Sequence, residues 1–537
     1  MYQENTNQNI TLDDSSKSSR KNISSINSDN DRYVTDVTYT MNYKPEINPL
    51  LINFSFLLAG IRAPIINKAC ELGFGQGLSL NFHAAGSPIA WYGNDFNRKH
   101  VLFAEELARA SGTNCVLSPQ AFRTFCARSD LPDFDFICLH GIWSWIDDEN
   151  RAIIVEFLHR KLKPGGVAYI SYNALPGMTD VMPIRKMLYE HASLADPDEG
   201  DLATKIDNAI TFIERFMQIN PKLSSDFPNM VQRLNHIKKQ PKQYLAHEYF
   251  NSDWKPAHFS DLKAILEPAG LQFACSANLI DHFNDIYLNQ DQIDFLNSID
   301  DISMRESMKD FIINQQFRAD YWVKDPEPLK PADKDAALRA IRVVLVKDFE
   351  KITPEFMTYM GTASLHQSVC EPILAVLSDY NPHSLHDIHK VVEARGLSLE
   401  QVLRVVAIFI AKEDLALANS DEVIEQVSLT CERLNTYLLA RGTIADDVNY
   451  MVSPLTGGGV LVPNVEQLYL VGRRRKLPDP VSWMKFAWDV NYSRIGGILG
   501  EEPGSTMPDD KFVAELKEHF HQWAGVKLPI LVALKIK

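Results

Sequence analysis

Three glycines alternate with other residues in the segment 71–77, which reads Glu-Leu-Gly-Phe-Gly-Gln-Gly. An apolar run predicts a strand at Lys68–Leu72, directly before the turn, and a helical pattern follows it. Glycine allows the backbone to turn tightly there and lets a ligand approach without meeting a Cβ atom. The segment therefore predicts a loop that binds a nucleotide-type cofactor.

Two details of this segment favour S-adenosylmethionine over a dinucleotide. The glycine spacing is G-x-G-x-G, whereas dinucleotide-binding loops have G-x-G-x-x-G. Glu71 also lies inside the predicted strand, where a carboxylate can receive the free amino group of S-adenosylmethionine, a group that a pyrophosphate lacks. An oxidoreductase that binds NAD remains an alternative, because dinucleotide enzymes share this strand-turn-helix geometry.

An acidic residue follows the next predicted strand, Pro88–Gly93, since Asp95 comes 18 residues after Gly77. In nucleotide-binding folds, a carboxylate roughly 20 residues past the glycine turn accepts hydrogen bonds from ribose hydroxyls. We therefore assign Asp95 to the ribose, and its neighbour Phe96 is predicted to bind the cofactor as well. The alternative role of Asp95 is the N-cap of the amphipathic helix predicted at Arg98–Ser111.

The adenine ring is expected between the loops that follow the strands predicted at Asn114–Leu117 and Phe134–Leu139. The first loop lacks an acid, so Gln120 or backbone amides would contact the ring, and Phe122 either walls it or belongs to the core. The second loop contains Gly141, which permits a close approach. The predicted cofactor-binding residues are Glu71, Gly73, Phe74, Gly75, Gly77, Asp95, Phe96, Gln120, Ala121, Phe122, His140 and Gly141.

Residues near the ends of the fourth and fifth strands are predicted to face the methyl acceptor. Methyl transfer from a sulfonium is an in-line displacement, so catalysis consists largely of positioning the acceptor. Tyr172 and Asn173 would orient an amine, and a structural turn is their alternative role. Trp143 or Trp145 would line the channel while the other belongs to the core, and His140 is a weaker candidate for a base. The predicted catalytic residues are Tyr172, Asn173 and Trp143, with no metal ligand.

Strands and helices alternate from Ile65 onward, which predicts a parallel sheet with helices on both faces. Residues 183–245 contain only helical patterns and predict an insertion. A helix at Phe259–Leu266 and strands at Leu271–Ala277 and Phe317–Lys324 then resume the sheet. Such an insertion would cover the carboxyl edge of the sheet, where ligands bind in open α/β folds.

The remaining chain predicts further domains, because single cores rarely exceed roughly 300 residues and this chain has 537. A proline-rich linker follows at 325–331. Helices at His386–Ala394 and Leu399–Ala411, with a strand at Leu415–Ala418, are typical of a winged helix, and glycine-rich Ser453–Val462 is its wing or a loop. The predicted domains are a disordered tail at 1–30, an α/β domain at 31–325, a helical middle region at 326–380, and a winged-helix-like and C-terminal helical domain at 381–537.

Composition narrows the function classes. The formal net charge is −15, which argues against nucleic acid as a partner, because phosphate neutralisation requires a basic face. The seven cysteines are scattered and form no C-x-x-C pair, which predicts neither a disulfide framework nor a zinc site but a reducing compartment. No apolar stretch approaches the ~20 residues of a membrane span, and the polar N-terminus has no signal-peptide core. We therefore expect a cytoplasmic protein.

Beyond the glycine segment, several strings carry a specific resemblance. They are LHGIWSW at 139–145, LKPGG at 162–166, YNALPG at 172–177 and LAHEY at 245–249. With them, residues 33–537 resemble the methyltransferases that carry a methyltransferase regulatory domain, and in particular the rickettsial protein lysine methyltransferases. Many members have cysteine or small residues within the glycine motif where this chain has Phe74 and Gln76, so side-chain contacts at these two positions differ from the family pattern.

The resemblance implies methylation of lysine ε-amines on an outer-membrane autotransporter protein, outer membrane protein B, before or during its export. It also implies a class I, Rossmann-like methyltransferase core with the helical insertion, followed by mainly helical middle and C-terminal winged-helix-type domains. A homodimer is an open alternative for the assembly. Other functions left open are a small-molecule N- or O-methyltransferase with an oligomerising tail and a DNA-binding module whose methyltransferase fold only senses its cofactor.

Overall fold

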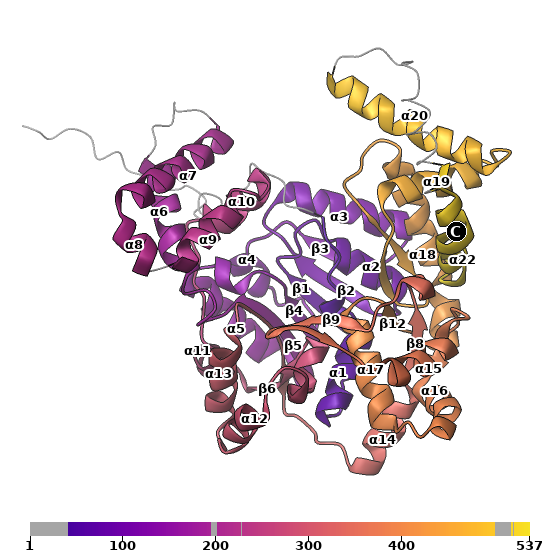
Figure 1. Ribbon diagram of the computed structural model, residues 1–537, viewed down its shortest axis with the longest axis horizontal. Helices are drawn as coiled ribbons and strands as arrows, with labels where there is room; N and C mark the ends of the chain where they lie inside the picture. Colours follow the sequence, from indigo (N-terminus) through magenta and orange to yellow (C-terminus); the bar gives the residue numbers. More distant parts are fainter. Residues whose placement is uncertain (1–40, 195–200, 227, 500–516, 519) are drawn as a thin grey trace, which may run out of the picture.

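The computed structural model describes residues 41–194, 201–226, 228–499, 517–518 and 520–537 (Figure 1). The predicted disordered tail at 1–30 lies outside these residues. The centre of the molecule is a seven-stranded sheet in the order β3-β2-β1-β4-β5-β7-β6. Its strands are β1 (Lys68–Leu72), β2 (Ala90–Asn94), β3 (Val116–Ser118), β4 (Phe134–Leu139), β5 (Leu162–Asn173), β6 (Leu271–Ser276) and β7 (Phe317–Lys324).

Strands β1 to β5 run parallel, and β7 is antiparallel to both β5 and β6. All six residues of β4 are buried, because helices cover both faces of a parallel sheet. One face carries α1 (Pro49–Ala59), α2 (Leu78–Gly86) and α3 (Arg98–Ser111), and the other carries α4 (Phe122–Cys126), α5 (Asp148–Lys161) and α11 (Phe259–Leu266). This arrangement confirms the predicted α/β fold class.

Local chemistry explains why several predicted boundaries agree with the structure. Helix α3 ends where Gly112 adopts φ +77° and its N–H donates to the Ala108 carbonyl at 2.9 Å.

Strand β5 begins earlier than predicted, at Leu162 instead of Val167. The Pro164-Gly165-Gly166 segment therefore lies inside the strand, where it produces a register shift between β4 and β5.

The insertion between β5 and β6 is helical and has its own apolar core. Its helices extend from the body at the left of Figure 1. Tertiary packing of these amphipathic helices, with Ile206, Ile213 and Leu245 inside, stabilises the insertion. The helices are α6 (Val181–Leu194), α7 (Leu202–Ile219), α8 (Pro221–Asp226), α9 (Pro228–Ile237) and α10 (Lys242–Tyr249).

A second group of short elements lies between β6 and β7 and leads the chain back into the sheet. Its core contains Leu296 and Ile313. Helix α12 begins with a capping box in which Asn289 and Gln292 satisfy each other's backbone N–H groups. The elements are the 3-10 turns η4 (Leu279–His282) and η5 (Asn284–Ile286), and the helices α12 (Gln290–Asn297) and α13 (Ile302–Ile313). A separate 3-10 turn, η3 (Glu267–Ala269), joins α11 to β6.

The region predicted as helical at 326–380 also contains strands, so that prediction is wrong in part. It holds α14 (Pro331–Ala340), β8 (Arg342–Leu345), η6 (Phe349–Lys351), β9 (Glu355–Thr358), β10 (Gly361–Ser364) and α15 (Gln367–Leu377). Strands of four residues are too short to show an alternating pattern of their own. Strand β8 forms the centre of a sheet in the order β11-β8-β12, which also crosses the boundary predicted at residue 380.

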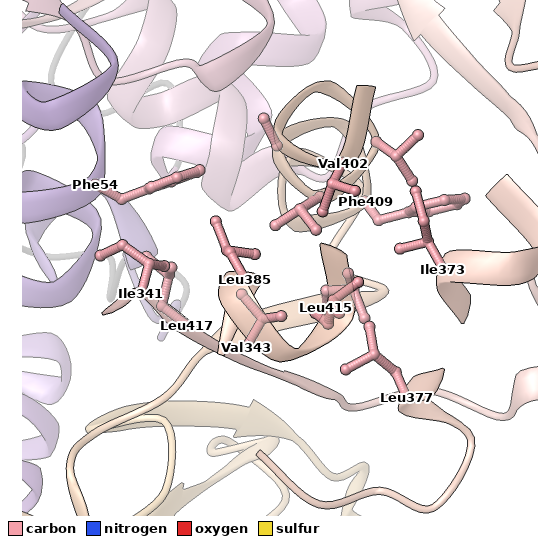
Figure 2. Close-up of a cluster of buried hydrophobic side chains, with 14 of the residues drawn as sticks. Phe54, Ile341, Val343, Ile373, Leu377, Leu385, Val402, Phe409, Leu415 and Leu417 are labelled. Carbon is pink, nitrogen blue, oxygen red and sulfur yellow. The ribbon is translucent and has the colours of Figure 1, made fainter. Parts of the chain in front are cut away.

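The C-terminal half begins with a helix-helix-strand arrangement at the predicted positions. Its elements are β11 (His383–Ser384), α16 (Leu385–Val392), η7 (Glu393–Arg395), α17 (Leu399–Ala411) and β12 (Leu415–Leu417). Their core joins this unit to the first domain, because Phe54 of α1 packs in the same cluster as Val343 and Leu417 (Figure 2). Burial of such large apolar side chains stabilises the contact between the two units.

The glycine-rich segment expected as a wing forms a hairpin of β13 (Tyr450–Ser453) and β14 (Gly458–Leu461) that pairs only with itself. It packs against α2 of the first domain, and α18 (Asp421–Gly442) packs against α2 and α3. The last described helices share a core in which Tyr469, Phe520 and Trp523 are buried. They are α19 (Asn464–Arg474), α20 (Pro480–Leu499), the π-helical turn η8 (Trp523–Lys527) and α22 (Leu528–Ala533).

Close packing at Gly86 provides a stability test of the contact between the two halves. A Cβ atom at Gly86 would lie 2.6 Å from the Gly457 carbonyl carbon, so Gly86→Ala must displace the hairpin. We expect the free energy of unfolding to fall by ~1–3 kcal/mol, as for other overpacked sites. Gly525 has no neighbour within 4 Å of an added Cβ, so Gly525→Ala is the matched control. Urea unfolding that is equal for both variants would contradict this contact.

Candidate active site

A cavity of about 620 Å³ opens at the carboxyl ends of β1, β2, β4 and β5, where ligands bind in open α/β folds. We call it the cofactor cavity. Most of the predicted site residues line it: Glu71, Gly73, Phe74, Gly75, Gly77, Asp95, Phe96, Ala121, Phe122, His140, Gly141 and Asn173. The structure thus brings together residues that are up to 102 positions apart, from Glu71 to Asn173.

The glycine loop turns from β1 into α2 with each of its three glycines at positive φ, between +58° and +69°. A Cβ at Gly73 would lie 2.6 Å from Ile142 Cδ1, so this position needs glycine for close packing. Gly75 has open space where its Cβ would be, and its N–H donates to Asp95 Oδ2 at 2.9 Å. The loop therefore exposes backbone to the cavity while a carboxylate holds it in place.

Glu71 lies at the end of β1 and is 5% exposed. Its Oε2 atom is buried and accepts no hydrogen bond from any residue that the structure describes. Burial raises the pKa of Glu71 to about 8, and the nearby Asp95 carboxylate adds to the rise. A buried acceptor without a donor is costly, and an ammonium group in the cavity would satisfy it. The residue therefore fits the amino group of S-adenosylmethionine.

Asp95 directly follows β2, where two backbone N–H groups donate to its carboxylate and a histidine ring faces it. Its Oδ2 accepts from Gly75 N–H, and its Oδ1 accepts from Asn97 N–H at 2.8 Å and faces His100 Nδ1 at 3.2 Å. The alternative role as N-cap of α3 is wrong, because the side chain of Asn97 caps that helix by accepting from Lys99 N–H at 2.9 Å. The carboxylate is free of the cap and faces the cavity.

The loops after β3 and β4 form the opposite wall. Phe122 begins α4, and its ring lies 3.5 Å from where a Cβ of Gly73 would be, so it belongs to the cavity wall as much as to the core. Gly141 has φ +65° and its N–H donates to Ser171 Oγ at 2.8 Å. Phe122 and Gly141 both line the cavity, so this part of its wall combines an aromatic ring with backbone that carries no side chain.

His140 stacks on Tyr169, with ring centroids 5.9 Å apart and an interplanar angle of 4°. Its Nδ1 shares a hydrogen bond of 2.9 Å with the Tyr169 hydroxyl. Burial lowers the pKa of His140 to about 3, and the positive charge of Lys44 lowers it further. A group with this pKa binds a proton too weakly to act as a general base near pH 7. The arrangement favours a neutral wall residue.

Two of the predicted catalytic residues do not reach the cavity. Tyr172 is 1% exposed and its hydroxyl donates to Asp320 Oδ2 at 3.3 Å, inside the core. Successive side chains of a strand point to opposite faces, so Asn173 faces the cavity and Tyr172 cannot. Trp143 is also a core residue, covered by the Arg151 guanidinium, and it is Trp145 that lines the cavity.

Gln120 is likewise outside the cavity lining. Its carbonyl accepts from Asn94 Nδ2 at 2.8 Å and its N–H donates to the Ser118 carbonyl at 2.9 Å. The first bond joins the ends of β2 and β3, and the second closes a turn within the loop. The predicted adenine contact by Gln120 is not supported by the cavity lining, the alternative of backbone amides stays a prediction, and Ala121 is the residue of this loop that lines the cavity.

Several cavity residues were not predicted. Lys44 and Glu46 come from the segment before α1, Phe317 from the start of β7, and His247 and Glu248 from α10 of the insertion. Trp254 Nε1, just after α10, donates to Asn173 Oδ1 at 2.9 Å and fixes that amide. No periodic signal marks Lys44 or Glu46. The LAHEY string that carried the family resemblance, at 245–249, was the available signal for the insertion.

The chain was compared with known proteins. A family model described as a predicted methyltransferase regulatory domain matches residues 241–324. The uncharacterized protein sll1526 of Synechocystis sp. is 32% identical over 514 residues, which cover 94% of this chain and 99% of the cyanobacterial protein. The chain belongs to this family of methyltransferases with a regulatory domain. The uncharacterized protein RP789 of Rickettsia prowazekii is 27% identical over 282 residues, 50% of this methyltransferase and 49% of that protein.

Among solved structures, PKMT2 from Rickettsia typhi superposes with a TM-score of 0.64 and 17% identity, over 93% of this methyltransferase and 99% of that chain. A second structure of it, in complex with AdoHcy, gives a TM-score of 0.63 and 18% identity. At these identities the match shows a shared fold across nearly the whole chain. The AdoHcy in that complex is the product that S-adenosylmethionine leaves after methyl transfer, and the fold of this chain is that of PKMT2.

Two further properties of the described residues bear on the site. None of the helices there combines the length and the apolar character needed to cross a membrane. Within the same residues, no cluster of three or more His, Cys, Asp and Glu side chains has the arrangement of a metal site.

The raised pKa of Glu71 predicts a proton release when AdoHcy binds. Below pH 8 the free protein holds this carboxyl mostly protonated, whereas an ammonium group beside it favours the carboxylate. Binding should therefore release up to one proton, and affinity should rise by up to ~10-fold per pH unit as the pH increases toward 8. Calorimetry at pH 6 and pH 7.5, in buffers of different ionisation enthalpy, measures both effects.

Glu71→Gln should abolish the proton release, while the exposed Glu156→Gln should preserve it. Equal proton release in Glu71→Gln and the unmodified protein would show that a different group titrates.

Proposed function

We propose that the protein transfers methyl groups from S-adenosylmethionine to lysine ε-amines of a protein substrate. The observation that carries the proposal is the acidic lining of the cofactor cavity, where carboxyl groups outnumber lysines. Its acidic residues are Glu46, Glu71, Asp95, Asp147, Glu248 and Asp253, against the single lysine Lys44. Such a cavity attracts a cationic acceptor, and a lysine ammonium is the cation that proteins present.

The proposed cofactor contacts follow the polar groups of the cavity. Glu71 would hold the amino group and Lys44, the lysine of this wall, would hold the carboxylate of the methionyl moiety. Asp95, held in place by the glycine loop, would accept from the ribose. Ala121 and Phe122 would face the adenine ring together with Gly141. S-adenosylmethionine supplies, when bound, a methyl group on a sulfonium that transfers to nitrogen as the carbon–sulfur bond breaks and its electron pair stays on sulfur.

The protein's own contribution is to orient a neutral amine. Asn173 lies at the end of β5 with its amide oxygen fixed by Trp254, so its orientation is set before a substrate arrives. Trp145 and Phe317 add apolar walls that disfavour the charged form of an amine. We propose Asn173 as the acceptor-positioning residue among the catalytic residues predicted from the sequence.

The proposed substrate is an outer-membrane autotransporter protein, methylated before or during export. The resemblance of residues 33–537 to rickettsial protein lysine methyltransferases supports this substrate class, and the fold shared with PKMT2 from Rickettsia typhi agrees with it. We place the reaction in the cytoplasm, where the free cysteines of this chain would stay reduced. The C-terminal half then serves a substrate far larger than a metabolite.

The test uses an unfolded passenger fragment of an outer-membrane autotransporter, methyl-labelled cofactor and mass spectrometry scored for each lysine. We expect label on lysines and none on a fragment whose lysines are acetylated. Label that persists on the acetylated fragment, or label on small amines alone, would contradict the lysine assignment.

Asp95→Asn should raise the KM for the cofactor by ~10–100-fold, since hydrogen bonds to a charged group contribute roughly 1.5–3 kcal/mol. The exposed Asp294→Asn is the matched control and should leave the KM unchanged. An unaltered cofactor KM in Asp95→Asn would remove Asp95 from the ribose site.

A further inference from the structure

A second cavity of about 620 Å³ lies between the sheet domain and the C-terminal half. We call it the interdomain cavity. Its walls come from the segment before α1, the ends of β6 and β7, the turn after α17, strand β12 and the hairpin β13–β14. Both halves of the chain are therefore needed to form it.

The interdomain cavity and the cofactor cavity share a wall. Glu46 and Phe317 line both of them. Phe317 is the first residue of β7 and pairs with Asn173 at the end of β5. The centroid of its ring lies 6.3 Å from that of the His140 ring. The backbone at Glu46 is fixed, because its carbonyl accepts from the Tyr321 hydroxyl at 2.5 Å. Glu46 and Phe317 thus separate the two cavities at the carboxyl edge of the sheet, next to the acceptor-positioning residue Asn173.

Two carboxyl groups in the lining of the interdomain cavity each have an oxygen without a hydrogen-bond donor. Glu46 Oε2 and Asp281 Oδ1 are both buried, and neither accepts a hydrogen bond from any described residue. In contrast, three of the four cations in this lining, Arg318, Lys347 and Lys412, already have anionic partners. Lys347 and Lys412 pair with the buried Asp414 at 2.7 Å and 3.0 Å. The unsatisfied capacity of this cavity is therefore for a cation with N–H donors.

Aromatic side chains complete the walls. Tyr43 and Tyr450 line the cavity with ring centroids 6.0 Å apart and an interplanar angle of 49°. Tyr359 and Phe317 lie in the same lining. Aromatic faces attract ammonium groups and keep that attraction after the groups are methylated. The combination of apolar rings and donor-free carboxylates suits an alkylammonium side chain.

We propose that the interdomain cavity admits the lysine side chain of the substrate, and that Glu46 at the shared wall binds its ammonium group and takes its proton. This inference rests on the proposed lysine methylation and assigns the path and the base for it. The acceptor then reaches the cofactor cavity past Phe317, from the side of the C-terminal half. The helical insertion closes the cofactor cavity from another side through His247 and Glu248.

The surroundings of Glu46 suit a base. Burial raises the pKa of Glu46. A hydrogen bond from its own backbone N–H and the positive charge of Lys44 oppose this rise, and Glu413 adds to it. The other titratable groups that sense its charge are the hydroxyls of Tyr43, Tyr169 and Tyr321, which stay protonated because burial raises each pKa. A carboxylate whose pKa lies above the ordinary value is a stronger acceptor for the proton of an ammonium.

One proton passes from the substrate lysine to Glu46 and then to solvent in each turnover. The lysine ammonium gives one proton to the Glu46 carboxylate and becomes a neutral amine with a lone pair. The nitrogen–carbon bond forms as the carbon–sulfur bond breaks, and the methylated amine again carries the positive charge. Glu46 returns its proton to solvent when the product leaves, so the residue is regenerated for the next turnover.

The experiment uses the full chain, the unfolded autotransporter fragment and labelled cofactor, with Glu46→Gln as the principal variant. General-base loss should lower kcat by ~100-fold or more. The affinity for AdoHcy should be unchanged, which also reports an intact fold. The pH profile of kcat should shift to higher pH in Glu46→Gln, because the amine must then lose its proton to solvent. Glu350→Gln, exposed and outside both cavities, is the control.

A second variant tests the path independently of the base. Leu461 on β14 lines the interdomain cavity and is 50% exposed, so Leu461→Trp narrows the entrance without disturbing a core. We expect a higher KM for the protein substrate with unchanged AdoHcy affinity. Glu248→Gln on the insertion side should have a smaller effect on kcat than Glu46→Gln.

The outcomes separate the two proposals. Lysine labelling by the unmodified protein with unchanged kcat in Glu46→Gln, or a larger loss in Glu248→Gln, overturns the interdomain path and leaves lysine methylation standing. Cofactor binding without any lysine labelling overturns both. Loss of kcat in Glu46→Gln with a raised substrate KM in Leu461→Trp supports both.

Discussion

The hydrogen bond from Gly75 N–H to Asp95 Oδ2 is the contact on which the cofactor cavity depends. It joins the glycine loop after β1 to the end of β2, so two separate chain segments take one fixed shape. It also holds the Asp95 carboxylate close to Glu71, whose pKa rises to about 8 through burial and this neighbouring charge. One contact thereby positions the loop and prepares Glu71 to receive a positive charge.

A second set of contacts joins the halves of the chain and creates the interdomain cavity. Asn48 Nδ2 donates to the Thr456 carbonyl at 3.1 Å, and Asn419 Nδ2 donates to the Gly86 carbonyl at 3.1 Å. Close packing of Gly86 on Gly457 brings the hairpin against α2. These contacts come from the segment before α1, from α2 and from the hairpin. The C-terminal half therefore packs directly on the sheet domain and helps to form the interdomain cavity.

The strength of the sequence signal depended on length and burial. Strand β4 and helix α11 were predicted with their observed bounds, because a fully buried strand has a continuous apolar run and an amphipathic helix has a clear period. Strands β9 and β10 escaped prediction, since each has four residues and they pair only with each other. Short exposed pairs have no core to dictate their pattern.

The site residues also differ in how far residue type and spacing could predict them. The glycine loop and Asp95 were found because backbone geometry demands particular residue types at particular spacings. Tyr172 and Trp143 were placed in the right segments, but the direction of each side chain depends on strand pleat and packing that spacing does not reveal. Glu46 was missed because its role comes from a partition between two cavities, and that partition exists only once residues hundreds of positions apart have packed together.

We propose that the cofactor lies between Glu71 and Asp95, which directs its sulfur toward the wall formed by Glu46 and Phe317. A crystal structure of the full chain with bound AdoHcy tests it most directly. The account predicts the amino group within hydrogen-bond distance of Glu71, the ribose hydroxyls at Asp95, and the sulfur facing the interdomain cavity. Density for AdoHcy outside the cofactor cavity, or a sulfur directed at Glu248 of the insertion, would contradict it.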